Sequence, residues 1–303
     1  MTWSPLFFGL ISLSPFGAEV PVPVPVPAVV NALQCDPAEN AYCEQIRELM
    51  GSAEVQRALA FIEETDEQAM RDLVTLTEIP APPFKEEVRA RAFADMLRAA
   101  GADSVWIDEV GNVIALREGT TGGSTVVFEG HLDTVFPEGT DVTVEMRGDT
   151  LYAPGVGDDT RGLVVVLQAL RALEAADIET EGDILFIGTV GEEGLGDLRG
   201  VKHLFREGGP QIDSYIAVDG GDEERMVVEG IGSHRFRVTF KGPGGHSWGA
   251  FGTANPAHAL GRAITIFENA ADAYTSSGPR TSYNIGRIGG GTSINSVPFE
   301  AWM

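Results

Sequence analysis

The feature that most constrains the fold is an alternation of short apolar runs with helical segments between residues 104 and 221. The runs STVVFEG, DILFIGTV and SYIAV are apolar almost throughout, which is typical of strands that are buried on both faces. Helices are expected between them, at residues 163–176 and around residues 198–206. The sequence therefore predicts the α/β class, with a mixed, mostly parallel sheet flanked by helices.

Helical and hairpin patterns surround this alternation. Apolar residues recur at mostly helical spacing over residues 54–76, until the prolines at residues 80–83 stop the pattern, and a second helix is expected at residues 86–100. The stretch VTVEMRGDTLYAPG is typical of a hairpin with a Gly-Asp turn. These elements complete a predicted domain at residues 31–228.

The pattern changes after about Met226. The stretch VVEGIGSHRFRVTFKG alternates like an exposed antiparallel strand, residues 257–273 form an amphipathic pattern, and the closing stretch returns to strand with a glycine-rich turn. We therefore predict a second, smaller α+β domain at residues 229–303.

Residues 1–30 are expected to lie outside the fold. The apolar run at residues 6–13 has the length of the apolar part of a signal peptide and is too short to span a membrane. The repeated Val-Pro that follows favours an extended linker. We expect an exported protein, periplasmic or secreted, with no membrane segment in its mature form; a misassigned start or a disordered tail would leave it cytoplasmic. Cys35 and Cys43 fit either a local disulfide or two free thiols.

The charge excludes one class of partner. The chain has 21 Lys and Arg against 45 Asp and Glu, a formal net charge of −24. Nucleic-acid binding draws most of its affinity from basic residues that neutralise phosphates, so we expect no nucleic-acid partner. Local acidic clusters, in contrast, can hold divalent cations.

Polar residues gather where the apolar strands end. In α/β sheets ligands bind at the carboxyl ends of the strands, so these side chains are expected to converge on one edge. A cluster of one imidazole and several carboxylates suits zinc, and a shared aspartate suits two zinc ions about 3.5–4 Å apart. The candidates are His131, Asp133, Asp158, Asp159, Glu192, Glu193 and Asp219.

Each candidate also has an ordinary structural interpretation. His131 and Asp133 fit a satisfied polar pair, or a ligand whose second ring N–H is accepted by the aspartate. The two adjacent aspartates fit the N-cap of the following helix. The two adjacent glutamates fit a solvated loop, or a metal ligand beside a proton acceptor, and Asp219 fits a capping acid before a turn.

The order of the motifs resolves these alternatives by resemblance. GHLDTVFP, GVGDDTRG, GTVGEEG, AVDG and GPGGHSWG resemble the dinuclear zinc exopeptidases and amidases, a family that includes peptidase T, glutamate carboxypeptidase, succinyl-diaminopimelate desuccinylase and the aminoacylases. The resemblance covers about residues 55–303, and GEEGLGDLRG and GGTSINSVPFEAWM look most like peptidase T. It implies a zinc-exopeptidase-like catalytic domain with an inserted lid and dimerisation domain, and a homodimer.

The resemblance also implies the metal ligands. His131 and Asp219 would bind one zinc, Glu193 would bind the other, and Asp158 would bridge the two. Cobalt or manganese could replace zinc. Family members supply one more histidine, as the partner of Glu193, from a region beyond the inserted domain. No histidine follows His258, so we expect a C-terminally truncated chain with an incomplete site.

The same resemblance implies the catalytic groups. Glu192 would be the general base that deprotonates a metal-bridging water, and Asp133 would orient the ligand histidine. His246 would enter the active site of a partner subunit and stabilise the oxyanion, while Asn255 and Asn295 would contact substrate.

The predicted function is therefore zinc-dependent hydrolysis of an amide bond in small peptides or N-acyl amino acids. A non-catalytic, truncated remnant that binds peptide or a partner chain is the alternative. An acidic calcium-binding domain would explain the charge but leaves His131 unexplained, because calcium takes oxygen ligands.

Overall fold

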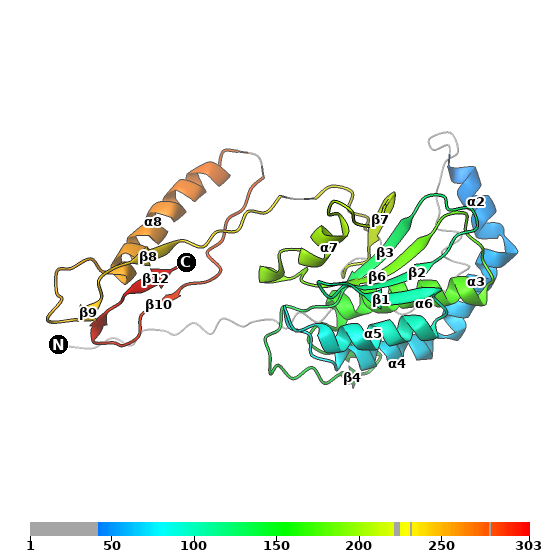
Figure 1. Cartoon of the computed structure of the whole chain (residues 1–303), viewed down its shortest axis with the longest axis horizontal. Coiled ribbons are helices and arrows are strands. Elements are labelled where there is room, and N and C mark those ends of the chain that lie inside the picture. Colours follow the sequence, from blue (N-terminus) through cyan, green and yellow to red (C-terminus); the bar gives the residue numbers. More distant parts are fainter. Residues whose placement is uncertain (1–41, 221–224, 231, 279) are drawn as a thin grey trace. The chain divides into compact units, whose positions relative to one another are not determined.

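A computed structural model of the chain describes residues 42–220, 225–230, 232–278 and 280–303 (Figure 1). The chain divides into two compact units, one ending at Arg225 and one running from Met226 to Met303. The predicted signal-like segment and Cys35 lie outside the described residues, whereas Cys43 is buried and disulfide-bonded. None of the described helices combines the length and apolarity that crossing a membrane requires.

A five-stranded sheet forms the centre of the first unit, in the order β1-β2-β6-β3-β7. β3 runs parallel to both of its neighbours, β6 and β7, whereas β2 is antiparallel to β1 and β6. Four strands therefore share one direction and β2 opposes them, which confirms the mixed, mostly parallel sheet. The strands are β1 (Ser104–Ile107), β2 (Val113–Arg117), β3 (Val126–His131), β6 (Ile184–Thr189) and β7 (Ser214–Ala217).

Helices cover both faces of this sheet (Figure 1). Phe93 and Leu97 of α5 pack with Leu163 and Leu167 of α6 in the main core, against one face. On the other face Leu204 of α7 packs in a smaller cluster with apolar residues of β2, β3 and β6. The helices of the unit are α2 (Cys43–Gly51), α3 (Ala53–Glu64), α4 (Asp66–Thr77), α5 (Glu87–Ala99), α6 (Arg161–Ala175) and α7 (Arg199–Leu204).

The helix expected at residues 54–76 is two helices, α3 and α4. Thr65 separates them: its backbone leaves the helical region at φ −107° and ψ 14°, and its hydroxyl donates to the carbonyl of Phe61 at 2.7 Å. A β-branched residue that bonds a carbonyl four residues back favours such a break. The predicted hairpin is confirmed, as β4 (Glu145–Arg147) pairs antiparallel with β5 (Thr150–Tyr152).

The second unit packs one long helix, α8 (Pro256–Thr275), against a small antiparallel sheet. A long strand is expected at residues 227–242, but among the described residues of this stretch only β8 (Thr239–Lys241) is a strand, and it pairs antiparallel with β12. The three-stranded sheet is β10 (Gly289–Gly290), β12 (Glu300–Trp302) and β8 (Thr239–Lys241), and β9 (Gly245–His246) pairs with β11 (Ser296–Val297).

Candidate active site

The predicted ligands come together at the carboxyl edge of the sheet in the first unit. His131 is the last residue of β3, and the loop that carries Glu192 and Glu193 follows β6. Asp158 lies in a short irregular turn, η1 (Val156–Thr160), just before α6. Because β3 and β6 are parallel neighbours, their ends meet at the same place.

Three of these side chains form a group that could hold a metal ion. One potential ligand atom from each of His131, Asp158 and Glu193 lies within 4.8 Å of the others. Nε2 of His131 is 2.9 Å from Oδ1 of Asp158 and 4.0 Å from Oδ1 of Asp219. The imidazole is only 3% exposed, whereas the side chains of the two aspartates are about 60% exposed, at 62% and 59%. A buried nitrogen ligand thus faces carboxylates that remain open to solvent.

The donor set fits zinc. Tetrahedral bonds of 2.0–2.2 Å to nitrogen and oxygen place ligand atoms about 3.4 Å apart. Contacts that range from 2.9 Å to at most 4.8 Å reach this spacing through small side-chain movements. One imidazole with several carboxylates is a zinc-type set, and calcium would have no use for the ring.

The electrostatics of the group also favour a bound cation. Burial raises the pKa of Glu193 to about 7, and the charges of Asp158 and Glu192 add to this shift. Burial raises the pKa of Glu192 as well. Burial opposes the charged form of His131, but its hydrogen bond with Asp158 and the neighbouring aspartates outweigh this effect and raise the pKa of the ring to about 10. A divalent ion would replace the proton and relieve the repulsion between carboxylates.

Asp133 contacts this group in a way that differs from the sequence interpretation. Nδ1 of His131 faces the main-chain carbonyl of Asp133 at 2.9 Å, whereas the nearest carboxylate oxygen is 3.7 Å away. The buried carboxylate instead accepts hydrogen bonds from the main-chain N–H groups of Glu192, at 3.0 Å, and Glu193, at 2.9 Å. The main chain of Asp133 therefore orients the ring, and its side chain holds the glutamate loop.

The two adjacent aspartates have different roles: one faces the candidate metal group and the other bonds the start of the following helix. Asp158 faces His131, whereas Asp159 is fully buried and accepts from the main-chain N–H of Gly162 at 3.1 Å, within the first turn of α6. Asp159 also accepts from the main-chain N–H of His131 at 2.8 Å. Asp159 therefore caps the start of α6, the structural alternative for this pair, and it also ties the end of β3 to this helix, which the sequence reasoning did not anticipate.

Sequence reasoning also missed a buried arginine. Arg89 is fully buried and donates from Nη1 to the carbonyl of Leu132 at 3.0 Å and from Nε to that of Ile79 at 3.1 Å. Burial lowers its pKa to about 10, while the charge of Asp133 opposes this shift. The available signal was its position four residues before Phe93, on the buried face of α5.

The remaining predicted residues lie in the second unit. His246 is exposed and pairs with Ser296 across β9 and β11. Asn255 is the N-cap of α8, where its Oδ1 accepts from the main-chain N–H of Ala257 at 3.0 Å. The main-chain carbonyl of Asn295 accepts from Ser247, which follows His246, at 2.9 Å. Asn255 thus has a structural role in its own helix, and the catalytic role of His246 and the substrate contacts of Asn255 and Asn295 stay predictions.

Comparisons with known proteins match the family that the motifs resemble. The profile of Peptidase family M20/M25/M40 matches residues 127–297. A succinyl-diaminopimelate desuccinylase from Corynebacterium glutamicum is 27% identical over 232 residues, which cover 75% of this chain and 62% of the relative. The aminopeptidase PepT from Bacillus cereus is 25% identical, with 78% of this chain and 64% of that chain covered and a TM-score of 0.48.

The di-peptidase Dug1p from Saccharomyces cerevisiae shows the same fold. It is 15% identical, with 82% of this chain and 70% of that chain covered and a TM-score of 0.56. The curated relatives are longer than the region they share with this chain, which covers between 34% and 62% of their length.

Proposed function

Because the chain belongs to Peptidase family M20/M25/M40, we propose that it is a metal-dependent hydrolase that cleaves an amide bond in small peptides or N-acyl amino acids. The observation that carries this proposal is the convergence of His131, Asp158 and Glu193 within 4.8 Å, beside Glu192. A binding module has no need of a second carboxylate next to such a group, whereas hydrolysis needs a proton acceptor there.

The proposed ligands are His131, Asp158, Glu193 and Asp219, and zinc is the expected metal, with cobalt or manganese as substitutes. When bound, zinc polarises the scissile carbonyl and makes water acidic enough to react at neutral pH. Glu192 takes the proton of the attacking water and later delivers it to the leaving nitrogen. Its raised pKa suits both steps, because a base that must also donate works best when its pKa lies closer to neutrality. Asp133 keeps this carboxylate in place by holding the main chain of the loop.

We further propose that two copies associate through the second unit and that His246 acts in the active site of the partner copy. Two features support this proposal. The imidazole of His246 is exposed, and α8 carries apolar side chains in contact with solvent, with Ile266 70% and Tyr274 59% exposed.

The test is a Glu192→Gln variant of the 303-residue chain, assayed for zinc binding and for hydrolysis of dipeptides, tripeptides and N-acyl amino acids. We expect zinc binding to persist and turnover to fall by about 10²–10⁴-fold, the usual loss when a general base is removed. The control is Glu179→Gln, which makes the same change at an exposed site. Unchanged turnover in the Glu192 variant would refute the mechanism. Zinc binding without turnover in the unaltered chain would favour the binding remnant.

A further inference from the structure

The loop between β6 and α7 is fixed at two points, on either side of Gly191. On one side, Oδ1 of Asn112 accepts from the main-chain N–H of Val190 at 3.1 Å, and the main-chain N–H of Gly200 donates to the carbonyl of Val190 at 2.9 Å. On the other side, Asp133 holds the main-chain N–H groups of the two glutamates. Gly191 lies between these points at φ +67°, a conformation that favours glycine. A change in the conformation of Gly191 would therefore shift the main chain that carries Glu192.

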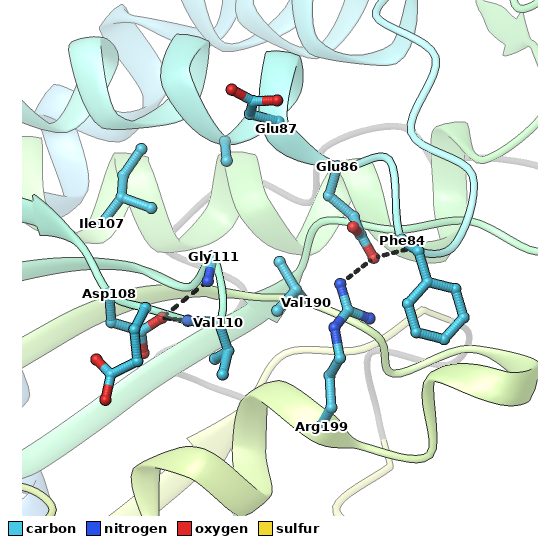
Figure 2. A pocket seen from close by; sticks show the side chains of 11 residues that line it. Phe84, Glu86, Glu87, Ile107, Asp108, Val110, Gly111, Val190 and Arg199 are labelled. Atoms are coloured by element: carbon cyan, nitrogen blue, oxygen red, sulfur yellow. Dashed lines mark hydrogen bonds and ion pairs between the residues drawn. The ribbon is translucent and has the colours of Figure 1, made fainter.

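Arg199 lies directly against this glycine. If Gly191 had a Cβ, the three nearest atoms would all belong to Arg199, and Nη1 would be only 1.9 Å away. Arg199 is the first residue of α7, and its Nη2 donates to Oε1 of Glu86 at 2.8 Å. Figure 2 shows this pair, with the ring of Phe84 beside it. The guanidinium carbon is 4.7 Å from the centre of that ring.

The Arg199–Glu86 pair is held in place through Glu86 and borders a cavity. Glu86 is only 4% exposed, and its Oε1 also accepts from the main-chain N–H of Phe84 at 3.0 Å. Next to the pair is a cavity of about 270 Å³, lined by Val190, Gly111 and Arg199 among others (Figure 2). The side chain of Arg199 therefore packs against Gly191 at the edge of this cavity.

The energetics of the pair argue against a role in stability alone. Glu86 is buried and the side chain of Arg199 is 25% exposed, so desolvation offsets much of their attraction, and the pair is weak evidence for stabilisation. Moreover, Nη1 of Arg199 is buried and has no hydrogen-bond partner among the described residues. A guanidinium placed for stability would use this donor. Its placement is explained instead by the contact with Gly191.

We propose that Arg199, held by Glu86, is a positioning residue that sets the conformation of Gly191 and thereby directs the carboxylate of Glu192. The proposal rests on the proposed function for the role of Glu192 as the base. Its structural part, that the pair immobilises the loop, does not depend on metal or on turnover.

The first test is hydrogen exchange on the metal-free protein, which separates this proposal from the proposed function. In Arg199→Met and in Glu86→Gln, we expect the amides of Glu192 and Glu193 to exchange about tenfold faster or more, because the loop opens locally. Amides of β6 should keep their rates. The matched control is Arg206→Met, which breaks an ion pair of 3.3 Å with Glu109 at the same cavity. It should leave the loop unchanged.

The second test is kinetic and uses the zinc-loaded protein. We expect kcat to fall by about 10–100-fold in Arg199→Met, with KM within about twofold, because a misplaced catalytic group lowers the rate more than binding. Arg199→Lys, which keeps the charge that faces Glu86, should restore part of kcat.

Two results would overturn the proposal. One is a folded Arg199 or Glu86 variant in which the amides of Glu192 and Glu193 exchange hydrogen at the wild-type rate. The other is equal acceleration in β6 and in the loop, which would show a purely structural role. If Arg199→Met does not fold, the milder Glu86→Gln decides by the same readout. Faster loop exchange in a protein that hydrolyses none of the substrates would uphold the positioning role and contradict only the proposed function.

Discussion

The contact between Asp133 and the glutamate loop leads to a stability prediction that needs no metal. The fully buried carboxylate accepts from the main-chain N–H groups of Glu192 and Glu193, one on each oxygen. Asp133→Asn keeps the shape but replaces one acceptor oxygen with an NH2 group. One partly buried N–H then loses its acceptor and faces a donor, which costs about 1–3 kcal/mol. Arg89 also loses a compensating charge nearby.

We therefore expect the free energy of unfolding of the metal-free protein to fall by about 2 kcal/mol. For a unit of this size the loss corresponds to a decrease in Tm of roughly 4–8 °C. Differential scanning calorimetry in the presence of a chelator measures this decrease in Tm from the unfolding transition of the first unit.

The matched control for this change is Asp141→Asn. Asp141 is exposed and accepts only from its neighbour Thr143, at 3.0 Å, among the hydrogen bonds of the described residues. An asparagine oxygen can take over that bond, so the free energy of unfolding should change by less than about 0.5 kcal/mol. If Asp133→Asn unfolds at the wild-type temperature, the carboxylate does not clamp the loop and the reasoning is wrong.

Two further predictions concern metal binding and the second unit. The pKa values of about 10 for His131 and about 7 for Glu193 imply that zinc displaces about one proton from these ligands at pH 8 and about two at pH 6, so affinity rises with pH and more steeply below pH 7. Calorimetry in buffers of different ionisation enthalpy counts these protons, and zero release at pH 8 would contradict the assignment of His131. If His246 acts in a partner copy, Glu192→Gln and His246→Ala variants mixed as dimers should regain activity that neither has alone; mixtures as inactive as their parents would rule this out.

Much of the fold could be predicted because it depends on local patterns. Apolar runs that end in Gly-His or Gly-Glu-Glu gave the positions of β3 and β6, and the parallel direction of these strands brings their ends together. The break at Thr65 was missed because helical periodicity continues across it on both sides. Placing this one-residue break requires knowledge of which carbonyl the hydroxyl of Thr65 bonds.

The contacts that support the site could not be predicted, because they join residues far apart in the chain. Arg199 and Glu86 are separated by 113 positions, and Asp133 and Glu192 by 59. Sequence patterns identify the residue types that hold a metal, but they do not say whether an aspartate orients a ring with its carboxylate or with its carbonyl. At Asp133 that choice is made by tertiary packing.

All four proposed metal ligands, from His131 to Asp219, are encoded in one continuous stretch that ends before the second unit begins at Met226. These four side chains therefore lie in a different unit from His246, whose exposed side chain is part of the surface proposed for association. A substitution in the second unit can change that surface without altering any of the four side chains, so binding of a partner copy and binding of metal by these residues can vary separately.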